Sequence, residues 1–539
     1  MFAVTYNVSR IIGIIALGGF VLGMDVSSMS IFIGSEHFNQ YFNFPGPFMQ
    51  GLMTGANPVG GLIGCILFGI VSERVSRVGD FQLFSSLWIM GSIVSALVLN
   101  AWMVVAGRLI RGISVGAFSV LLPLYIGEVI TSDRKGAATS IVQLSLTAAI
   151  LVMFYVCFFL NFLNNDLSFR LAWGIEIVPA LALLLSSYVL PESPKWLVAR
   201  GEYAKAQEIL GHLSASSHGD TGNDSFSKIE LLEKYGSLKK ISYLTLFSKN
   251  LRVHTLIGMT IQIMVQTCGI NVLMFYVVYI CEMIGFEGNI KMMSASVPYI
   301  INVVFTLIPI HTLDKLRRKE VLVYGAFFLS ITMTLIGTVM GAYGHEVPPM
   351  NGNKAIVWEI KGKPGLVVLG LCFLFVAVFA STLSCCAWLY TNEILPARAK
   401  SKGMSLCMAT SWCLNSVLAF LTPTLLSRIK WATFILLGGV TFVIVSLVSY
   451  AFPETYGLSE TEVENLFLAD MGLKSDNTDE EKSENWSERP RSPAPSSDYG
   501  SNNTKVAAPV DLKVEESAFA IGYEGTTCKQ KEGRKFDIK

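Results

Sequence analysis

Apolar segments long enough to cross a membrane recur along this chain of 539 residues. An α-helix rises about 1.5 Å per residue, so about 20 apolar residues span the roughly 30 Å hydrocarbon core of a bilayer. Such runs lie at residues 11–33, 50–71, 81–99, 103–128, 138–160, 172–190, 253–282, 295–313, 321–343, 365–392, 403–426 and 431–451. Inside lipid the backbone groups must bond to each other, and a helix satisfies its own. We therefore predict an all-α membrane protein with twelve transmembrane helices.

The composition argues against other classes of protein. Only 15% of the residues are charged, against about 25% in an average soluble domain, which excludes a soluble enzyme. The 41 basic residues are balanced by 40 acidic ones, so no net field attracts a nucleic acid. The cysteines lie mostly in apolar runs and show no spacing typical of a metal site. We expect neither enzymatic activity nor a metal or other cofactor.

A long charged loop divides the apolar runs into six and six, as in transporters built from two bundles. We expect an N-terminal six-helix bundle at 1–190, a central loop with short helices at 191–252, a C-terminal six-helix bundle at 253–452 and a tail at 453–539. From about residue 472 the tail is polar and rich in proline, which predicts disorder. The loops on the side of the central loop hold 20 Lys and Arg, against 7 on the opposite side. This bias places the central loop and both termini in the cytoplasm.

Charged motifs recur at the predicted cytoplasmic helix ends of both halves. Glu73 and Arg74 follow the second run, and Asp314 and Arg318 stand at the matching place six helices later. The other members of the repeat are Glu128, Arg134 and Lys135 in the first half, and Glu393, Arg398 and Lys400 in the second. Opposite charges at helix ends can pair across the cytoplasmic face in one state and separate in another. A single cluster would be an ordinary basic cap at the membrane surface, but the recurrence favours a cytoplasmic gate.

Five further motifs stand in a fixed order along the chain. They are Gly18-Gly19-Phe20 with Gly23 and Asp25, Gly107-Arg108 leading to Glu128, Pro191-Glu192-Ser193-Pro194-Lys195-Trp196-Leu197, Gln266 with Gly269-Ile270-Asn271, and Pro453-Glu454-Thr455 with Gly457-Leu458. Together they resemble the sugar-porter branch of the major facilitator superfamily, its fungal members most of all. The resemblance covers residues 11 to about 467. It implies alternating access of a sugar or polyol to a site between two six-helix halves.

Two opposite charges, Asp25 and Arg108, lie inside predicted helices. At 1.5 Å per residue, both lie about 8–9 Å below the outer surface of the bilayer, so they can pair. Arg111, one turn further along, is a second possible partner. Such a pair can be purely structural. In the resembling family the matching aspartate takes up the proton in proton-coupled members, but facilitators carry it too, so symport and facilitated diffusion both stay open.

Amide side chains inside the predicted helices are candidates for binding a sugar. An amide offers both a donor and an acceptor, which suits the hydroxyl groups of a neutral polyol. The resemblance implies that substrate is contacted by Gln143, Gln266, Asn271, Asn302 and Trp388, and Gln262 lies one turn before Gln266. For a single membrane amide, a bond between helices is the more common role. Several amides at matching positions favour a binding site.

The candidate site and gate depart from the family pattern. Val265 precedes Gln266 where the family commonly has a second glutamine, and Leu383, Cys385 and Ser411 replace a tryptophan, a proline and a glutamine. The gate has Lys135 and Lys400 in place of arginines, and lysine cannot make the bidentate contact of arginine. We therefore expect a more apolar site, with an altered or weakened substrate preference, and a looser gate.

The sequence thus predicts a transporter of a sugar or sugar-like polyol, in which proton coupling is one of two options. The rival hypothesis is a nutrient sensor of the same fold that does not transport and signals through its cytoplasmic tail. We expect a monomer whose partners are the substrate, membrane lipid and, in a symporter, the proton. The plasma membrane is the first expectation for its location and an internal membrane the second.

Overall fold

The computed structural model describes residues 4–33, 36–131, 134–163, 165–215, 241–249, 251–274, 281, 288–347, 358–458 and 462–463. The chain divides into two units, Met1–Ser475 and Asp476–Lys539, and every described residue lies in the first. The part of the tail for which the sequence predicts disorder falls outside the described residues.

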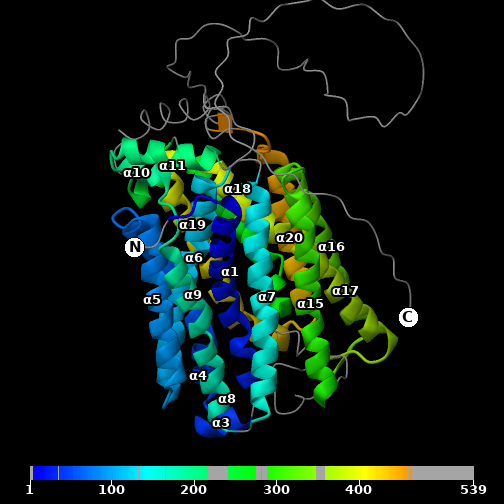
Figure 1. Ribbon diagram of the computed structural model, residues 1–539. Helices are drawn as coiled ribbons and strands as arrows, with labels where there is room; N and C mark the ends of the chain where they lie inside the picture. The colour runs from blue at the N-terminus through cyan, green and yellow to red at the C-terminus, as the bar shows by residue number, and fades with distance from the viewer. Residues whose placement is uncertain are drawn as a thin grey trace, which may run out of the picture. The chain divides into compact units, whose positions relative to one another are not determined.

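Helices build the described unit and coincide with the predicted apolar runs (Figure 1). The first half contains α1 (Val8–Ser28), α2 (Ser30–Ile33), α3 (Glu36–Tyr41), α4 (Pro47–Val71), α5 (Arg77–Ala96), α6 (Ala101–Val129), α7 (Lys135–Asn161), α8 (Leu167–Ile175) and α9 (Ile177–Ser187). The central loop contains α10 (Pro194–Ala199), α11 (Tyr203–Ala215) and the 3₁₀-helix η1 (Tyr243–Phe247). The second half contains α13 (Arg252–Thr267), α15 (Gly288–Thr312), α16 (Arg318–Tyr343), α17 (Lys363–Ser381), α18 (Leu383–Ile394), η2 (Ala397–Ala399), α19 (Lys400–Arg428) and α20 (Ala432–Ala451). In Figure 1, α10 and α11 lie at one end of the long helices and α3 at the other, and we call these the α10 end and the α3 end.

Within the described residues, ten helical segments are long and apolar enough to cross a membrane. The runs at 81–99 and 295–313 are covered by α5 and α15, which are not among the ten. The prediction of a helical membrane protein is therefore confirmed, and the number of twelve stays a prediction. One detail is a correction: β1 (His345–Glu346) and β2 (Trp358–Glu359) form a short antiparallel ribbon between α16 and α17, where the sequence predicts only a loop.

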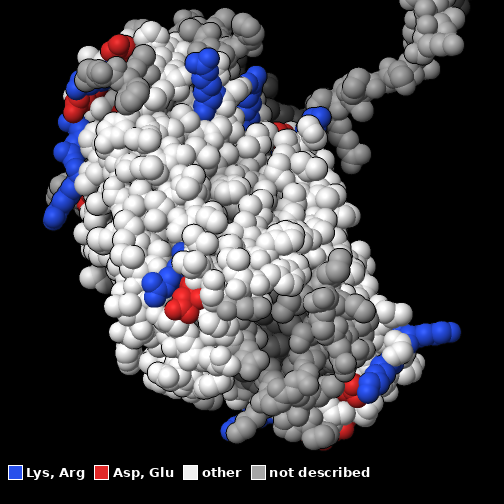
Figure 2. Space-filling model, turned by 60° about the horizontal axis from the view of Figure 1, so that its bottom comes forward, with Lys and Arg blue, Asp and Glu red and all other residues white. Residues whose placement is uncertain are grey.

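The outer surface of the helices is apolar. On α20, Val443 is 68% exposed and Tyr450 is 92% exposed. Most of the described surface seen in Figure 2 carries no charged side chain; one basic and one acidic group lie side by side within this face, and the other visible Lys and Arg lie toward its margins. Apolar surface is unfavourable in water and favourable against lipid chains, so this exterior suits a bilayer.

Four of the predicted membrane segments are interrupted, the first of them at Met29 between α1 and α2. α8 and α9 meet at Glu176, and α17 and α18 meet at Thr382. After α13, Gly269 has a φ of 92°, a backbone conformation that glycine adopts at no steric cost, and helical residues follow it. Interrupted membrane helices commonly mark binding sites because they free backbone groups and redirect side chains.

Candidate functional site

The interruption at Gly269 brings two amides of the same segment, Gln266 and Asn271, into hydrogen-bond contact. Asn271 Nδ2 donates to Gln266 Oε1 at 2.5 Å, because the turn after α13 points the Asn271 side chain back toward the helix. Gln266 Nε2 donates to Ser411 Oγ of α19 at 2.8 Å. One turn earlier, Gln262 Nε2 donates to Thr391 Oγ1 of α18 at 3.1 Å. The predicted residues Gln262, Gln266 and Asn271 therefore lie together, and they tie their segment to α18 and α19.

The other predicted sugar contacts lie on helices that pack against one another. Gln143 is on α7, Asn302 on α15 and Trp388 on α18, and α7 packs against both α15 and α18. Gln143 and Asn302 are buried, Trp388 is partly buried, and the Asn302 Oδ1 atom has no hydrogen-bond partner within the described residues. The structure gives no hydrogen bond that joins these three to Gln266, so their place in one binding site stays a prediction.

Trp412, which is not among the predicted site residues, bridges the two halves. Trp412, next to Ser411 on α19, donates from Nε1 to Ser119 Oγ of α6 at 3.1 Å. The indole thus combines a broad apolar face with one polar contact. Its position beside Ser411 was the available signal, because Ser411 stands at a predicted site position.

Four charges lie together in the interior of the first half. Asp25 of α1 contacts Arg108 Nη2 at 3.3 Å and Arg111 Nη1 at 3.0 Å, and both arginines belong to α6. Arg111 also forms an ion pair with Glu176, at the interruption between α8 and α9. All four side chains are buried. The pairing predicted for Asp25 is present, and its role in transport stays a prediction. Glu176 was missed, although a carboxylate inside the apolar run 172–190 is a visible signal.

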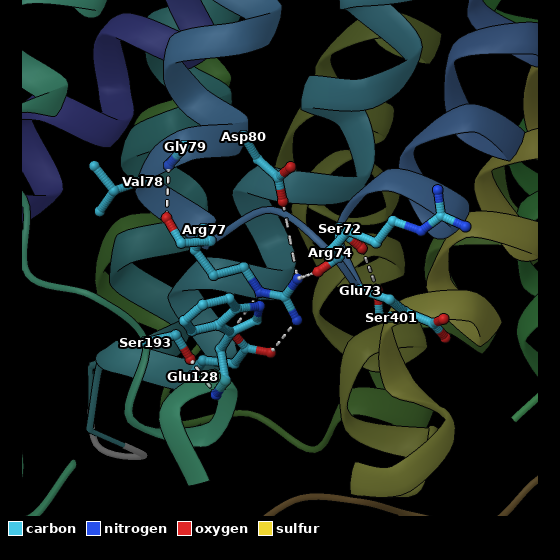
Figure 3. Close-up of polar contacts among 12 residues, drawn as sticks. Ser72, Glu73, Arg74, Arg77, Val78, Gly79, Asp80, Glu128, Ser193 and Ser401 are labelled. Carbon is cyan, nitrogen blue, oxygen red and sulfur yellow. Dashed lines mark hydrogen bonds and ion pairs between the residues drawn. The ribbon is translucent and has the colours of Figure 1, made fainter. Parts of the chain in front are cut away.

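At the α10 end, the charged motifs form the same arrangement twice. In the first half, Arg77 donates from Nε and Nη2 to the two carboxylate oxygens of Glu128 at 3.0 and 3.1 Å (Figure 3). In the second half, Arg318 lies 3.6 Å from Glu393. Glu192 accepts hydrogen bonds from the backbone N–H of Arg77 at the start of α5, and Glu454 does the same for Arg318 at the start of α16. A carboxylate at a helix N-terminus bonds free N–H groups and is favoured by the helix dipole.

This arrangement corrects the predicted partners of the gate. The pairs of Glu128 and Glu393 lie within each half, although we expected opposite charges to pair across the halves. Arg74 is exposed, and it is Arg77 that contacts Glu128, because α5 begins at Arg77 and turns that side chain inward. Lys135 and Lys400 interact electrostatically with Glu393, and Arg134 is exposed at the start of α7. The side chain of Arg398 falls outside the described residues.

Other contacts at the α10 end do cross between the halves. The predicted gate residue Glu73 contacts Lys402 Nζ at 2.5 Å, and Ser72 Oγ lies 2.8 Å from Ser401 Oγ. Asp314 of the second half accepts hydrogen bonds from the N–H groups of Gly136 and Ala137 at 2.7 and 2.8 Å, which caps α7 of the first half. In the described structure the two halves are therefore joined at this end.

The chain is similar to known transport proteins in both sequence and fold. The model of the Sugar (and other) transporter family matches residues 11–467. A probable metabolite transport protein of Saccharomyces cerevisiae is 38% identical over 469 residues, which cover 86% of this chain and 87% of the relative. High-affinity glucose transporter 1 of Candida albicans is 35% identical over 470 residues, which cover 85% of each. The structure of the proton:xylose symporter XylE of E. coli bound to 6-bromo-6-deoxy-D-glucose has a TM-score of 0.73 at 23% identity and covers 86% of this chain and 99% of its own. At that identity the likeness concerns the fold.

Proposed function

Because the chain belongs to the sugar (and other) transporter family, in the major facilitator superfamily, we propose that it carries a neutral sugar or polyol across a membrane by alternating access. Its relatives are transporters and not enzymes. The transport cycle then needs no bond chemistry, only a substrate that binds the occluded state better than the open ones.

The observation that carries this proposal is the amide group at the interruption after α13. Gln266 donates to Ser411 and accepts from Asn271, so its amide already uses both kinds of hydrogen bond. A sugar hydroxyl is also both a donor and an acceptor, and it can exchange with these partners without leaving a polar group unpaired. The buried Oδ1 atom of Asn302, which no group in the described part of the chain bonds, supplies a further acceptor from α15.

We propose a hexose as the first substrate to test. Relatives of this chain in Candida albicans and Kluyveromyces lactis bear the name of high-affinity glucose transporter, at 35% and 30% identity. The side chains of Val265, Leu383 and Ser411 are smaller, and offer fewer hydrogen bonds or a shorter reach, than the glutamine, tryptophan and glutamine that the family commonly has at these positions. A site with fewer hydrogen-bonding side chains can satisfy fewer sugar hydroxyl groups. A sugar with fewer hydroxyl groups, such as a pentose or a deoxy sugar, is therefore the next substrate to test.

The same proposal includes the topology. Twelve spans in two six-helix halves, at 1–190 and 253–452, would place both termini, the central loop and the α10 end in the cytoplasm. The contacts of Glu73 with Lys402 and of Asp314 with α7 would then close the cytoplasmic side and break when the site opens inward. One chain contains both halves, so a monomer is sufficient for the activity. The proposed location is the plasma membrane.

Uptake measurements test the proposal. The full chain is expressed in cells stripped of their own porters and supplied with radiolabelled D-glucose, D-xylose or myo-inositol. Saturable uptake of one of them, competed by the unlabelled compound, is the expected result. Binding of a sugar without uptake would instead favour the nutrient sensor. Absence of both binding and uptake across hexoses, pentoses and polyols would overturn the proposed substrate class.

A further inference from the structure

We propose that Arg111 makes transport by this chain independent of protons, because it fixes a second positive charge between the Asp25 and Glu176 carboxylates. This inference rests on the proposed transport function. Asp25, Arg108, Arg111 and Glu176 are called the buried quartet below.

The geometry gives Arg111 a bridging position. Its Nη1 atom lies 3.0 Å from Asp25 Oδ1 and also pairs with Glu176 Oε2. Arg108 contacts the other oxygen of Asp25, Oδ2, at 3.3 Å. Asp25 is thus held by two guanidinium groups, and one of them is shared with the second carboxylate. Three separate elements meet in this one cluster: α1, α6 and the junction of α8 with α9.

Charge counting shows what the second arginine does. With all four groups ionised, two positive and two negative charges cancel inside the quartet. One added proton would leave an uncompensated positive charge buried among apolar helices, where charges are poorly solvated and interact strongly. Without Arg111, the remaining three groups would carry a net negative charge, which one proton would neutralise. Arg111 therefore supplies permanently the charge that a transported proton would supply for part of the cycle.

The surroundings offer no other ionised partner within the described residues. The charged or titratable groups that face the quartet are its own members and Cys157 of α7, whose thiol donates to Ser28 O at 3.8 Å. From α5, Gly91 packs against the Arg111 stem, and a Cβ there would lie 2.8 Å from Arg111 Cγ. α2 and α4 contain no charged residue.

An aromatic cluster lies between the quartet and the α3 end. Phe38 of α3 packs 5.4 Å from Phe169, and Phe169 packs 5.7 Å from Trp173, measured between ring centroids. Phe32 of α2 contacts Trp173 at 6.2 Å, and all four rings are buried. Trp173 lies three residues before Glu176 on the way in from that end. Glu176 thus follows, by one helical turn, an apolar aromatic cluster whose rings are buried, and apolar surroundings disfavour a change in the charge of a buried group.

Flux measurements on the purified full chain in liposomes test the proposal. Counterflow of labelled D-glucose or D-xylose into liposomes loaded with the same unlabelled sugar measures carrier activity without any gradient. With counterflow established, we expect initial rates at pH 5.5 and pH 7.5 to agree within about twofold, less than the roughly tenfold change per pH unit of a single titrating carboxyl. We also expect no accumulation when a proton gradient is imposed. Gradient-driven accumulation of the sugar would overturn the inference. Absence of counterflow with every sugar would overturn the transport function itself, and with it this inference.

Variants with matched charge separate this role from a structural one. Arg111→Gln leaves the quartet one positive charge short, and we expect acid-stimulated flux that an imposed proton gradient accelerates. Arg111→Gln combined with Glu176→Gln restores the charge balance, so its flux should again be insensitive to pH. Arg111→Lys keeps the charge and should resemble the unmodified chain. Acid stimulation that persists in the balanced double variant would contradict the charge argument. If Arg111→Gln does not fold, the measurements on the unmodified chain still decide the proposal.

Discussion

At the scale of single residues, Gln266 has the most specific environment of the candidate sugar contacts. Its amide is buried, donates to one helix and accepts from the residue beyond the interruption in its own segment. Inside the membrane, water does not replace such a bond when it is lost. A change of this side chain therefore affects both the binding of substrate and the packing of the helices.

Replacement of the amide tests its contact with substrate. Gln266→Leu keeps a similar length and removes the polar atoms, so each lost hydrogen bond to sugar should cost about 0.5–1.5 kcal/mol, or roughly two- to tenfold in KM. The measurement is the concentration dependence of sugar uptake at matched amounts of protein in the membrane. Thr260→Ala, which removes a hydroxyl bonded only to the backbone of its own helix, is the control. An unchanged KM in Gln266→Leu would remove this residue from the site.

A residue of the site can be predicted from sequence only as well as the start of its helix, because that start decides which way each side chain points. Asp25, Gln266 and Asn271 stand out because polar residues in apolar runs are few. The predicted gate included Arg74 and omitted Arg77, the observed partner of Glu128, because that pairing depends on where α5 begins. Ser76 caps that helix by accepting from Gly79 N at 3.0 Å, which puts Arg77 in the first turn and leaves Arg74 outside it. Lys402 was likewise not assigned to Glu73, because contacts between halves are not visible in one sequence.

At the scale of the elements, close helix pairs depend on glycine. A Cβ at Gly23 of α1 would lie 2.1 Å from Leu146 O of α7, and a Cβ at Gly64 of α4 would lie 2.0 Å from Ile113 O of α6. Because the obstructing atoms belong to the backbone, they cannot move aside as a side chain would. Membrane helices lack a hydrophobic driving force for association, and close packing of small residues replaces it.

The contact between α4 and α6 gives a stability prediction. Gly64→Ala should force the two backbones apart and destabilise the protein by about 1–3 kcal/mol, the usual cost of overpacking. Gly439→Ala on α20, where the added Cβ meets nothing within 4 Å, is the matched control and should be neutral or slightly stabilising. Thermal unfolding of both purified variants in the same detergent is the measurement. Equal melting temperatures for the two variants would contradict the packing argument.

The apolar runs predicted nearly all of the helices but not their interruptions. Runs 172–190 and 365–392 read as single helices, although the structure divides them at Glu176 and Thr382. Pro179 lies three residues after Glu176, and a proline cannot donate to the carbonyl of residue i−4, here Ile175, so the first division had a local signal in the sequence. Thr382 has no proline in the turn that follows it, and its division had no comparable signal. The ribbon of β1 and β2 was missed because strands of two residues leave no detectable alternation of polar and apolar side chains.

At the scale of the whole described unit, the central loop takes part in joining the halves. Tyr243 of η1 donates to Ile66 O of α4 at 2.9 Å and lies 2.9 Å from Ser405 Oγ of α19. Lys402, the partner of Glu73, lies 5.9 Å from the Tyr243 ring. Burial raises the pKa of the Tyr243 hydroxyl, so this group keeps its proton and remains a donor at neutral pH. If the halves rock apart at the α10 end during transport, these contacts must break.

Removal of the Tyr243 hydroxyl should therefore favour opening at the α10 end. Tyr243→Phe keeps the ring and deletes its hydrogen bonds, each worth about 0.5–1.5 kcal/mol, which would raise the ratio of open to closed molecules by roughly two- to tenfold per bond lost. Spin labels at positions 74 and 317, which are exposed and lie in opposite halves, report the distance across this end when the native cysteines have been replaced. Leu244→Ala changes a residue of η1 that is 84% exposed, so it should leave the distance distribution unchanged. A distribution in Tyr243→Phe identical to that of the control would show that the Tyr243 hydroxyl does not hold the halves together, and closure would then depend on the other contacts between the halves, such as those of Glu73 and Asp314.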